Sequence, residues 1–151
     1  MADVWFYHLE GRSAESVLPV MMQRGLERNL RMAIETSDAA RAAEISQALW
    51  AAEDVAFIPH GWGETPNPAD NPVWITTTSE NPNGADYRFF VDGRFPESVD
   101  KLVRATILFD AGDANAVQTA RDLWKKFKAE GHAIKYWRMD DGGRWQDQAG
   151  Q

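Results

Sequence analysis

The 151-residue chain is 44% hydrophobic, carries a net charge of −7 and has no cysteine, which predicts one compact domain without disulfides, thiolate nucleophiles or Cys-rich zinc sites. Its overall acidity opposes broad binding to the phosphate backbone of nucleic acid. Because no apolar run approaches the roughly 18 residues of a membrane span, and the N-terminal segment lacks the basic-then-apolar order of a secretory signal, we expect a cytoplasmic protein without a membrane partner.

The first half of the chain alternates strand-like and helix-like segments. Val4 to Leu9 is rich in β-branched and aromatic residues and predicts an opening strand. Ser13 is expected to cap a helix, because apolar residues recur after it at steps of three and four. Leu30 to Ile34 predicts a second strand, and Ser37 stands where the cap of a second, Ala-rich helix belongs.

The second half continues this alternation around one long loop. Val55 to Ile58 predicts a short strand, and the segment from Gly61 to Pro72, crowded with Gly, Pro and Asn, predicts the loop. Pro96 is expected to open a short helix. Further strands are predicted over 73–78, 87–92, 106–109 and 132–139, a long helix over 113–131, and a frayed polar tail over 140–151.

The order of these segments indicates the fold class. Strands that alternate with helices at this spacing favour a parallel sheet covered on both faces. We therefore predict a single three-layer α/β domain over residues 1–139, with a twisted, largely parallel sheet, followed by a polar tail over 140–151.

The long last helix is predicted to bury one side. Ala116, Ala120, Leu123 and Phe127 step by four, three and four residues, so they lie in one stripe along the helix. We expect this stripe to face the core.

A second stripe lies one residue further round the same helix. It consists of Val117, Arg121, Trp124 and Lys128, with Lys125 beside them. The surrounding segment 121–138 holds six cations against two anions, although the chain as a whole is acidic. An exposed indole among cations suits a peptide with an apolar end and carboxylates, because an arginine grips a carboxylate with two hydrogen bonds. The same spacing also fits an indole that packs against a neighbouring strand.

Motifs for catalysis are missing from the sequence. No GxxxxGK[ST], GxGxxG or GxSxG occurs, and the three histidines have no metal-ligand spacing, so we predict no catalytic residue, cofactor or metal site. An alternative is a nucleotide-binding enzyme with an unrecognised loop. In that reading Gly61 to Asn71 would form a lid and His60 would act as acid or base.

Several segments together resemble a known family. They are FYHL near the start, ALW before AFIPHG, PVWITT, NPNGAD, and LFD followed by ARDLWKKFKAEGHAIKYW, and they run from Val4 to Trp137. In order and spacing they resemble the chi subunit of bacterial DNA polymerase III. The resemblance implies a fold similar to a nucleotide-binding domain without its phosphate loop, and a non-catalytic adaptor in DNA replication.

The resemblance also implies partners and their sites. Chi-like proteins link the clamp loader, through the psi subunit or another of its subunits, to single-stranded-DNA-binding protein by binding the acidic C-terminal tail of that protein. DNA is then contacted indirectly. The matching tail-binding positions are Arg121, Trp124, Lys125, Lys128, Val117 and Phe127, and the psi-facing positions are Trp50 and Phe57. Direct binding of single-stranded DNA through Trp124 and the lysines is a further alternative.

Overall fold

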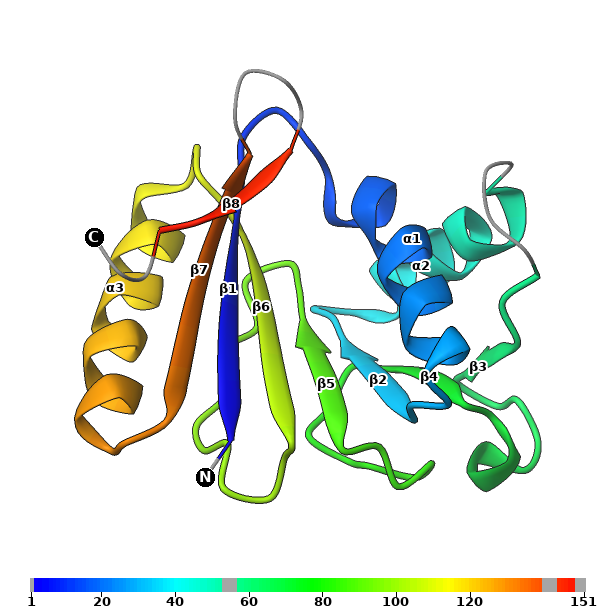
Figure 1. The fold of residues 1–151 in the computed structure, drawn as a ribbon. Coiled ribbons are helices and arrows are strands. Elements are labelled where there is room, and N and C mark those ends of the chain that lie inside the picture. Colours follow the sequence, from blue (N-terminus) through cyan, green and yellow to red (C-terminus); the bar gives the residue numbers. More distant parts are fainter. Residues whose placement is uncertain (1, 53–56, 140–143, 149–151) are drawn as a thin grey trace.

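The computed structural model describes residues 2–52, 57–139 and 144–148. In this part of the chain, eight strands form one sheet in the order β3-β4-β2-β5-β6-β1-β7-β8 (Figure 1). Every neighbouring pair is parallel except β7 and β8, which are antiparallel. The strands are β1 Asp3–Leu9, β2 Met32–Glu35, β3 His60–Trp62, β4 Val73–Thr76, β5 Tyr87–Phe90, β6 Arg104–Asp110, β7 Ala133–Met139 and β8 Trp145–Asp147.

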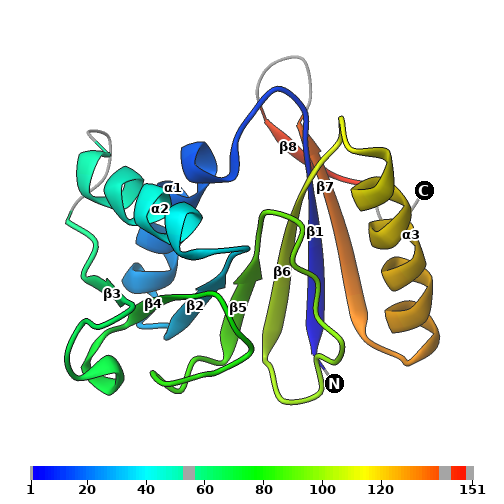
Figure 2. The same cartoon turned by 180° about the vertical axis from the view of Figure 1, so that it is seen from behind.

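Three α-helices connect the strands and cover both faces of the sheet. They are α1 Ala14–Glu27, α2 Ala39–Ala51 and α3 Ala114–Ala129. α1 and α2 lie together over the β2 and β4 end of the sheet, whereas α3 lies beside β7 at the other end (Figures 1 and 2). The predicted α/β class, with one largely parallel sheet and helices on both faces, is confirmed.

The alternation of side chains in β1 separates two apolar clusters. Val4 and Phe6 point to one face, where they join Phe127 of α3. Leu9 points to the other face, where it joins Leu18 of α1. Because successive side chains of a strand point to opposite sides, one central strand contributes to both clusters.

The N-terminus of α2 differs from the prediction by one residue. The cap is Asp38, whose carboxylate accepts a hydrogen bond from the backbone N–H of Arg41 at 2.8 Å, and not Ser37. A carboxylate at this position satisfies an unpaired helical N–H as a hydroxyl would, so the two neighbouring residues compete for the same role. At α1 the predicted Ser13 is the cap residue, although its side chain makes no capping hydrogen bond.

The helix predicted after Pro96 is wrong, because residues 96–103 contain a turn and bends but no helix. The hydroxyl of Ser98 accepts a hydrogen bond from the backbone N–H of Asp100, and such local bonds compete with helical ones. The apolar pattern nevertheless marks a buried residue: Val99 is 1% exposed in the cluster under α3. Burial without a helix explains the misleading periodicity.

The sequence also predicts the short strand β3 at the wrong residues and does not predict β8. Residues 55 and 56 of the strand expected at Val55 to Ile58 lie outside the described residues, and Phe57 and Ile58 are not in a strand. The strand β3 occupies His60–Trp62 instead, so the predicted loop begins later and contains a short 3₁₀ helix, Pro68–Asp70. β8 lies within the expected frayed tail, where the ring of Trp145 packs edge-on against Tyr7.

Candidate functional site

The helix α3 begins at a well-formed cap and buries the predicted side. The carboxylate of Asp113 accepts hydrogen bonds from the backbone N–H groups of Asn115 and Ala116 at 3.0 and 3.2 Å. Ala116, Ala120 and Phe127 are buried, and Leu123 packs against them from the edge of the cluster. The core-facing stripe of the prediction is therefore confirmed.

Phe127 belongs to the core and not to a binding surface. Its side chain is 0% exposed and packs edge-on against the ring of His132, with ring centroids 5.8 Å apart. A side chain without exposed surface does not touch a partner, so the expectation that Phe127 contacts a bound tail is wrong. Its position supports the helix from inside.

The second stripe of α3 forms a continuous surface of mixed character. Val117 and Trp124 are half-buried and pack on the edge of the core, while Arg121, Lys125 and Lys128 are exposed. The ammonium of Lys128 lies 4.5 Å from the centroid of the Trp124 ring, a cation–π distance. The indole therefore packs against the cluster under α3 and still keeps part of its surface exposed, with Lys128 over its ring.

The cations of this stripe are available for an incoming anion. None of the ion pairs within residues 2–52, 57–139 and 144–148 includes Arg121, Lys125 or Lys128. Arg121 lies close enough to Tyr136 of β7 to oppose the effect of burial, which raises the pKa of that phenol. The guanidinium of Arg121 thus forms no ion pair with an acidic side chain of the described residues.

A polar network closes the β7 side of the stripe. The hydroxyl of Tyr136 is hydrogen-bonded to His8 at 2.9 Å, and Arg138 donates to Glu10 at 2.6 Å. The hydrogen bond from His8, followed by the charge of Arg138, lowers the pKa of the Glu10 carboxyl. Sequence reasoning did not assign these four residues to the site. The alternation of β7 places Tyr136 and Arg138 on the α3 side, but their neighbourhood to β1 required the strand order.

Comparison with known proteins shows the family of the chain. The model of the family described as "DNA polymerase III chi subunit, HolC" matches residues 1–135. The chain belongs to this family. It is also 26% identical over 104 residues to the "Probable DNA polymerase III subunit chi" of Rickettsia prowazekii (strain Madrid E). That match covers 69% of this chain and 61% of the relative.

A second surface of this chi-family chain is an exposed aromatic pair. Trp50 at the end of α2 is 59% exposed and Phe57 is 67% exposed, and their ring centroids lie 5.1 Å apart. Both were predicted as members of one partner-facing surface, and the structure brings them together. Large exposed apolar side chains in contact with one another are typical of surfaces that bind other proteins.

His60 is bonded within the fold through both ring nitrogens. Nε2 is hydrogen-bonded to the hydroxyl of Ser46 at 2.8 Å, and Nδ1 to the backbone carbonyl of Ile58 at 2.8 Å. These bonds join α2 to β3 and give His60 a structural role in this conformation. The adjoining loop is held by Arg31, which donates to the backbone carbonyls of Ala69 and Asn83.

The described part of the chain has no group of three or more His, Cys, Asp or Glu side chains that could hold a metal ion. Within the same ranges, no helix is both long and apolar enough to cross a bilayer.

Proposed function

We propose that the chain is a non-catalytic adaptor of DNA polymerase III in DNA replication, and that the exposed stripe of α3 binds the acidic C-terminal tail of single-stranded-DNA-binding protein. The observation that carries this proposal is the half-buried Trp124, with Lys128 over its ring and, beside it, Arg121 and Lys125, which form no ion pair among the described residues. The edge of the indole and Val117 would bury the apolar end of the tail. The cations would bind its carboxylates.

The energetics assign most of the affinity to the cations. Burial of one aromatic side chain supplies roughly 1.5 to 3 kcal/mol. A micromolar complex requires about 8 kcal/mol. Hydrogen bonds to charged groups contribute about 1.5 to 3 kcal/mol each, so two or three of them supply the remainder.

Calorimetry with a synthetic tail peptide tests this site. Arg121→Ala is expected to weaken binding about tenfold or more, because it removes charge-assisted hydrogen bonds. Trp124→Ala is expected to weaken it similarly through the loss of apolar burial. Lys101→Ala is the matched control, since Lys101 is also exposed and lies in the loop before β6. Wild-type affinity in the Arg121 and Trp124 variants would contradict the proposal.

We also propose that Trp50 and Phe57 bind the psi subunit or another clamp-loader subunit, so that contact with DNA through these partners is indirect. Their exposed ring pair supports this second surface. A Trp50→Ala/Phe57→Ala variant should lose clamp-loader proteins in a pull-down and keep the tail peptide. Val103→Ser is the control, because Val103 is a 48% exposed apolar side chain elsewhere on the surface. Equal recovery of clamp-loader proteins with the wild type, the double variant and the control would rule this surface out.

A further inference from the structure

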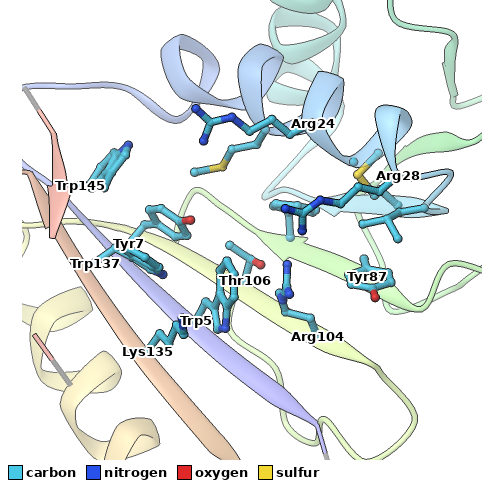
Figure 3. Close-up of a pocket in the computed structure, with 15 residues that line it drawn as sticks. Trp5, Tyr7, Arg24, Arg28, Tyr87, Arg104, Thr106, Lys135, Trp137 and Trp145 are labelled. Atoms are coloured by element: carbon cyan, nitrogen blue, oxygen red, sulfur yellow. The ribbon is translucent and has the colours of Figure 1, made fainter. Parts of the chain in front are cut away.

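A pocket lies on the face of the sheet opposite α3. It has a volume of about 310 Å³ and lies between α1 and the strands β5, β6, β1, β7 and β8 (Figure 3). Trp5 and Tyr7 of β1 point into it, as does Trp137 of β7, because they occupy the strand positions that alternate with the core residues under α3. Neither α3 nor the Trp50 and Phe57 pair contributes to this pocket.

Aromatic rings form one wall of the pocket. Trp137 lies 5.7 Å from Trp5 and 6.0 Å from Tyr7, measured between ring centroids. Trp145 of β8 meets Tyr7 edge-on at 5.1 Å. These rings are half-buried, so part of their surface remains open to the pocket. Trp137 and Trp145 lie beyond residue 135, where the match to the family model ends.

Four cations line the pocket, two on the α1 side and two beside the aromatic rings on the sheet. Arg24 extends from α1 and Arg28 from the C-terminal cap of that helix, while Arg104 comes from β6 and Lys135 from β7 (Figure 3). Among the residues that the structure describes, no acidic side chain lines the pocket. Among ion pairs of the described residues, these four cations take part in one, between Arg104 and Asp3 at the long distance of 4.0 Å. The pocket is thus strongly positive in a chain whose net charge is −7.

Two cations are already held against aromatic faces. The guanidinium of Arg104 lies 3.6 Å from the centroid of the Trp5 ring, and the ammonium of Lys135 lies 5.3 Å from the same centroid. Two donors in this wall, Nε of Arg104 and Nε1 of Trp137, have no hydrogen-bond partner in the described structure. Both donors are buried, so what the wall presents to a ligand is flat apolar surface together with fixed positive charge.

We infer that this pocket binds a short segment of single-stranded nucleic acid. Bases would stack on the open indole surfaces, and phosphates would lie against the arginines and the lysine. A single strand fits this chemistry better than a duplex, because the bases of a duplex already stack on one another. The volume is at the lower end of the roughly 300 to 1,000 Å³ that small-ligand pockets have, which suits one or two nucleotides.

Fluorescence anisotropy with labelled oligonucleotides tests the inference on the whole chain. Short oligothymidylate and oligouridylate strands distinguish DNA from RNA, and a duplex of equal length is the negative control. We expect binding of at least one single strand, with an affinity that falls as salt rises. No binding of either strand at low salt, or equal binding of the duplex, would overturn the inference.

Two sets of variants locate the binding. Arg24→Glu/Arg28→Glu changes exposed residues at the C-terminal end of α1 and should abolish binding or reduce the salt slope by about 0.7 for each phosphate that is no longer neutralised. Trp145→Ala should weaken binding about tenfold because a stacking surface is removed, while Trp145→Phe keeps a ring and retains most of the affinity. Unchanged binding in Arg24→Glu/Arg28→Glu would overturn the inference even if the tryptophan variants were unstable.

A reversal of charge on α3 separates this site from the proposed tail site. Arg121→Glu/Lys125→Glu makes the same change in charge on the opposite face of the sheet. It should leave oligonucleotide binding unchanged and abolish binding of the tail peptide. Arg24→Glu/Arg28→Glu should abolish oligonucleotide binding and leave binding of the tail peptide unchanged. If only the α3 variant lost oligonucleotide binding, the nucleic-acid contact would lie at Trp124 and the inference about the pocket would be overturned. If the α3 variant kept its binding of the tail peptide, that result would contradict the proposed function and leave the inference about the pocket standing.

Discussion

Glu35 and Arg88 form the most buried ion pair of the described residues, with side chains 5% and 7% exposed. The Glu35 carboxylate accepts hydrogen bonds from Arg88 at 2.7 and 3.1 Å and from Arg94 at 2.9 Å. Arg88→Ala leaves a buried carboxylate with one remaining partner, so we expect the free energy of unfolding to fall by about 3 kcal/mol. Urea denaturation measures this change.

Arg94 provides the control for that experiment. Its side chain is 36% exposed, and it contacts the same carboxylate. Arg94→Ala should cost about 1 kcal/mol, because water can replace a partly exposed guanidinium. If the two variants were equally stable, burial would not determine the strength of this pair.

Tyr7 links the pocket to alkaline stability. Burial raises the pKa of its phenol from 10.0 to about 12, against the opposing charges of Arg104 and Arg24. The folded state therefore holds the phenol proton more tightly than the unfolded state does. The resulting contribution to the free energy of unfolding is complete below pH 10 and is lost as pH rises through about 12. We expect the wild type to lose about 2 kcal/mol more than Tyr7→Phe across this window. Urea denaturation of the wild type and of Tyr7→Phe at the two ends of this pH window measures the difference. Equal losses of unfolding free energy in the two proteins would mean that the phenol is solvated.

At the scale of single elements, the caps of α3 and α1 make a matched pair. Asp113 accepts two backbone hydrogen bonds at the start of α3, whereas the Ser13 side chain accepts none at the start of α1. Asp113→Ala should therefore lower the free energy of unfolding by about 1 kcal/mol, and Ser13→Ala by only a few tenths. Thermal unfolding of the two variants compares them directly. A larger effect at Ser13 would contradict this account of the caps.

The success of the sequence in predicting elements depended on whether burial and local bonding agreed. In α3 the apolar steps, the cap at Asp113 and the glycine after the helix all indicate the same segment, and the helix runs from Ala114 to Ala129. After Pro96 the apolar pattern is present, yet Ser98 bonds locally and no helix forms. The short strands β3 and β8 have three residues each, too few for a periodic signal.

At the scale of the whole molecule, the stripe of α3 and the pocket differ in how far the sequence predicts them. The stripe of α3 was predictable because its residues repeat along one helix. The pocket was not, since Trp5, Arg104 and Trp137 come from β1, β6 and β7, whose adjacency depends on the strand order. Seven tryptophans are evident in the sequence, but only the fold shows that three of them converge.

The division of the core into two clusters raises the question of whether the molecule unfolds in one step. β1 contributes Val4 and Phe6 to one cluster and Leu9 to the other, and pairs with β6 and β7 along its length. A strand shared by both clusters couples their stability, because neither can lose β1 without exposing the other. We therefore expect Phe127→Ala to destabilise the whole domain by about 3 to 5 kcal/mol.

Leu18→Ala, in the cluster under α1, is the matched variant on the other face, and its side chain is also 0% exposed. Each variant should show one transition, with tryptophan fluorescence and far-ultraviolet circular dichroism changing at the same urea concentration. Separate transitions in Phe127→Ala would mean that α3 unfolds from the sheet independently. In that case the stripe of α3 and the pocket behind it would belong to different cooperative units, and a ligand at one would not stabilise the other.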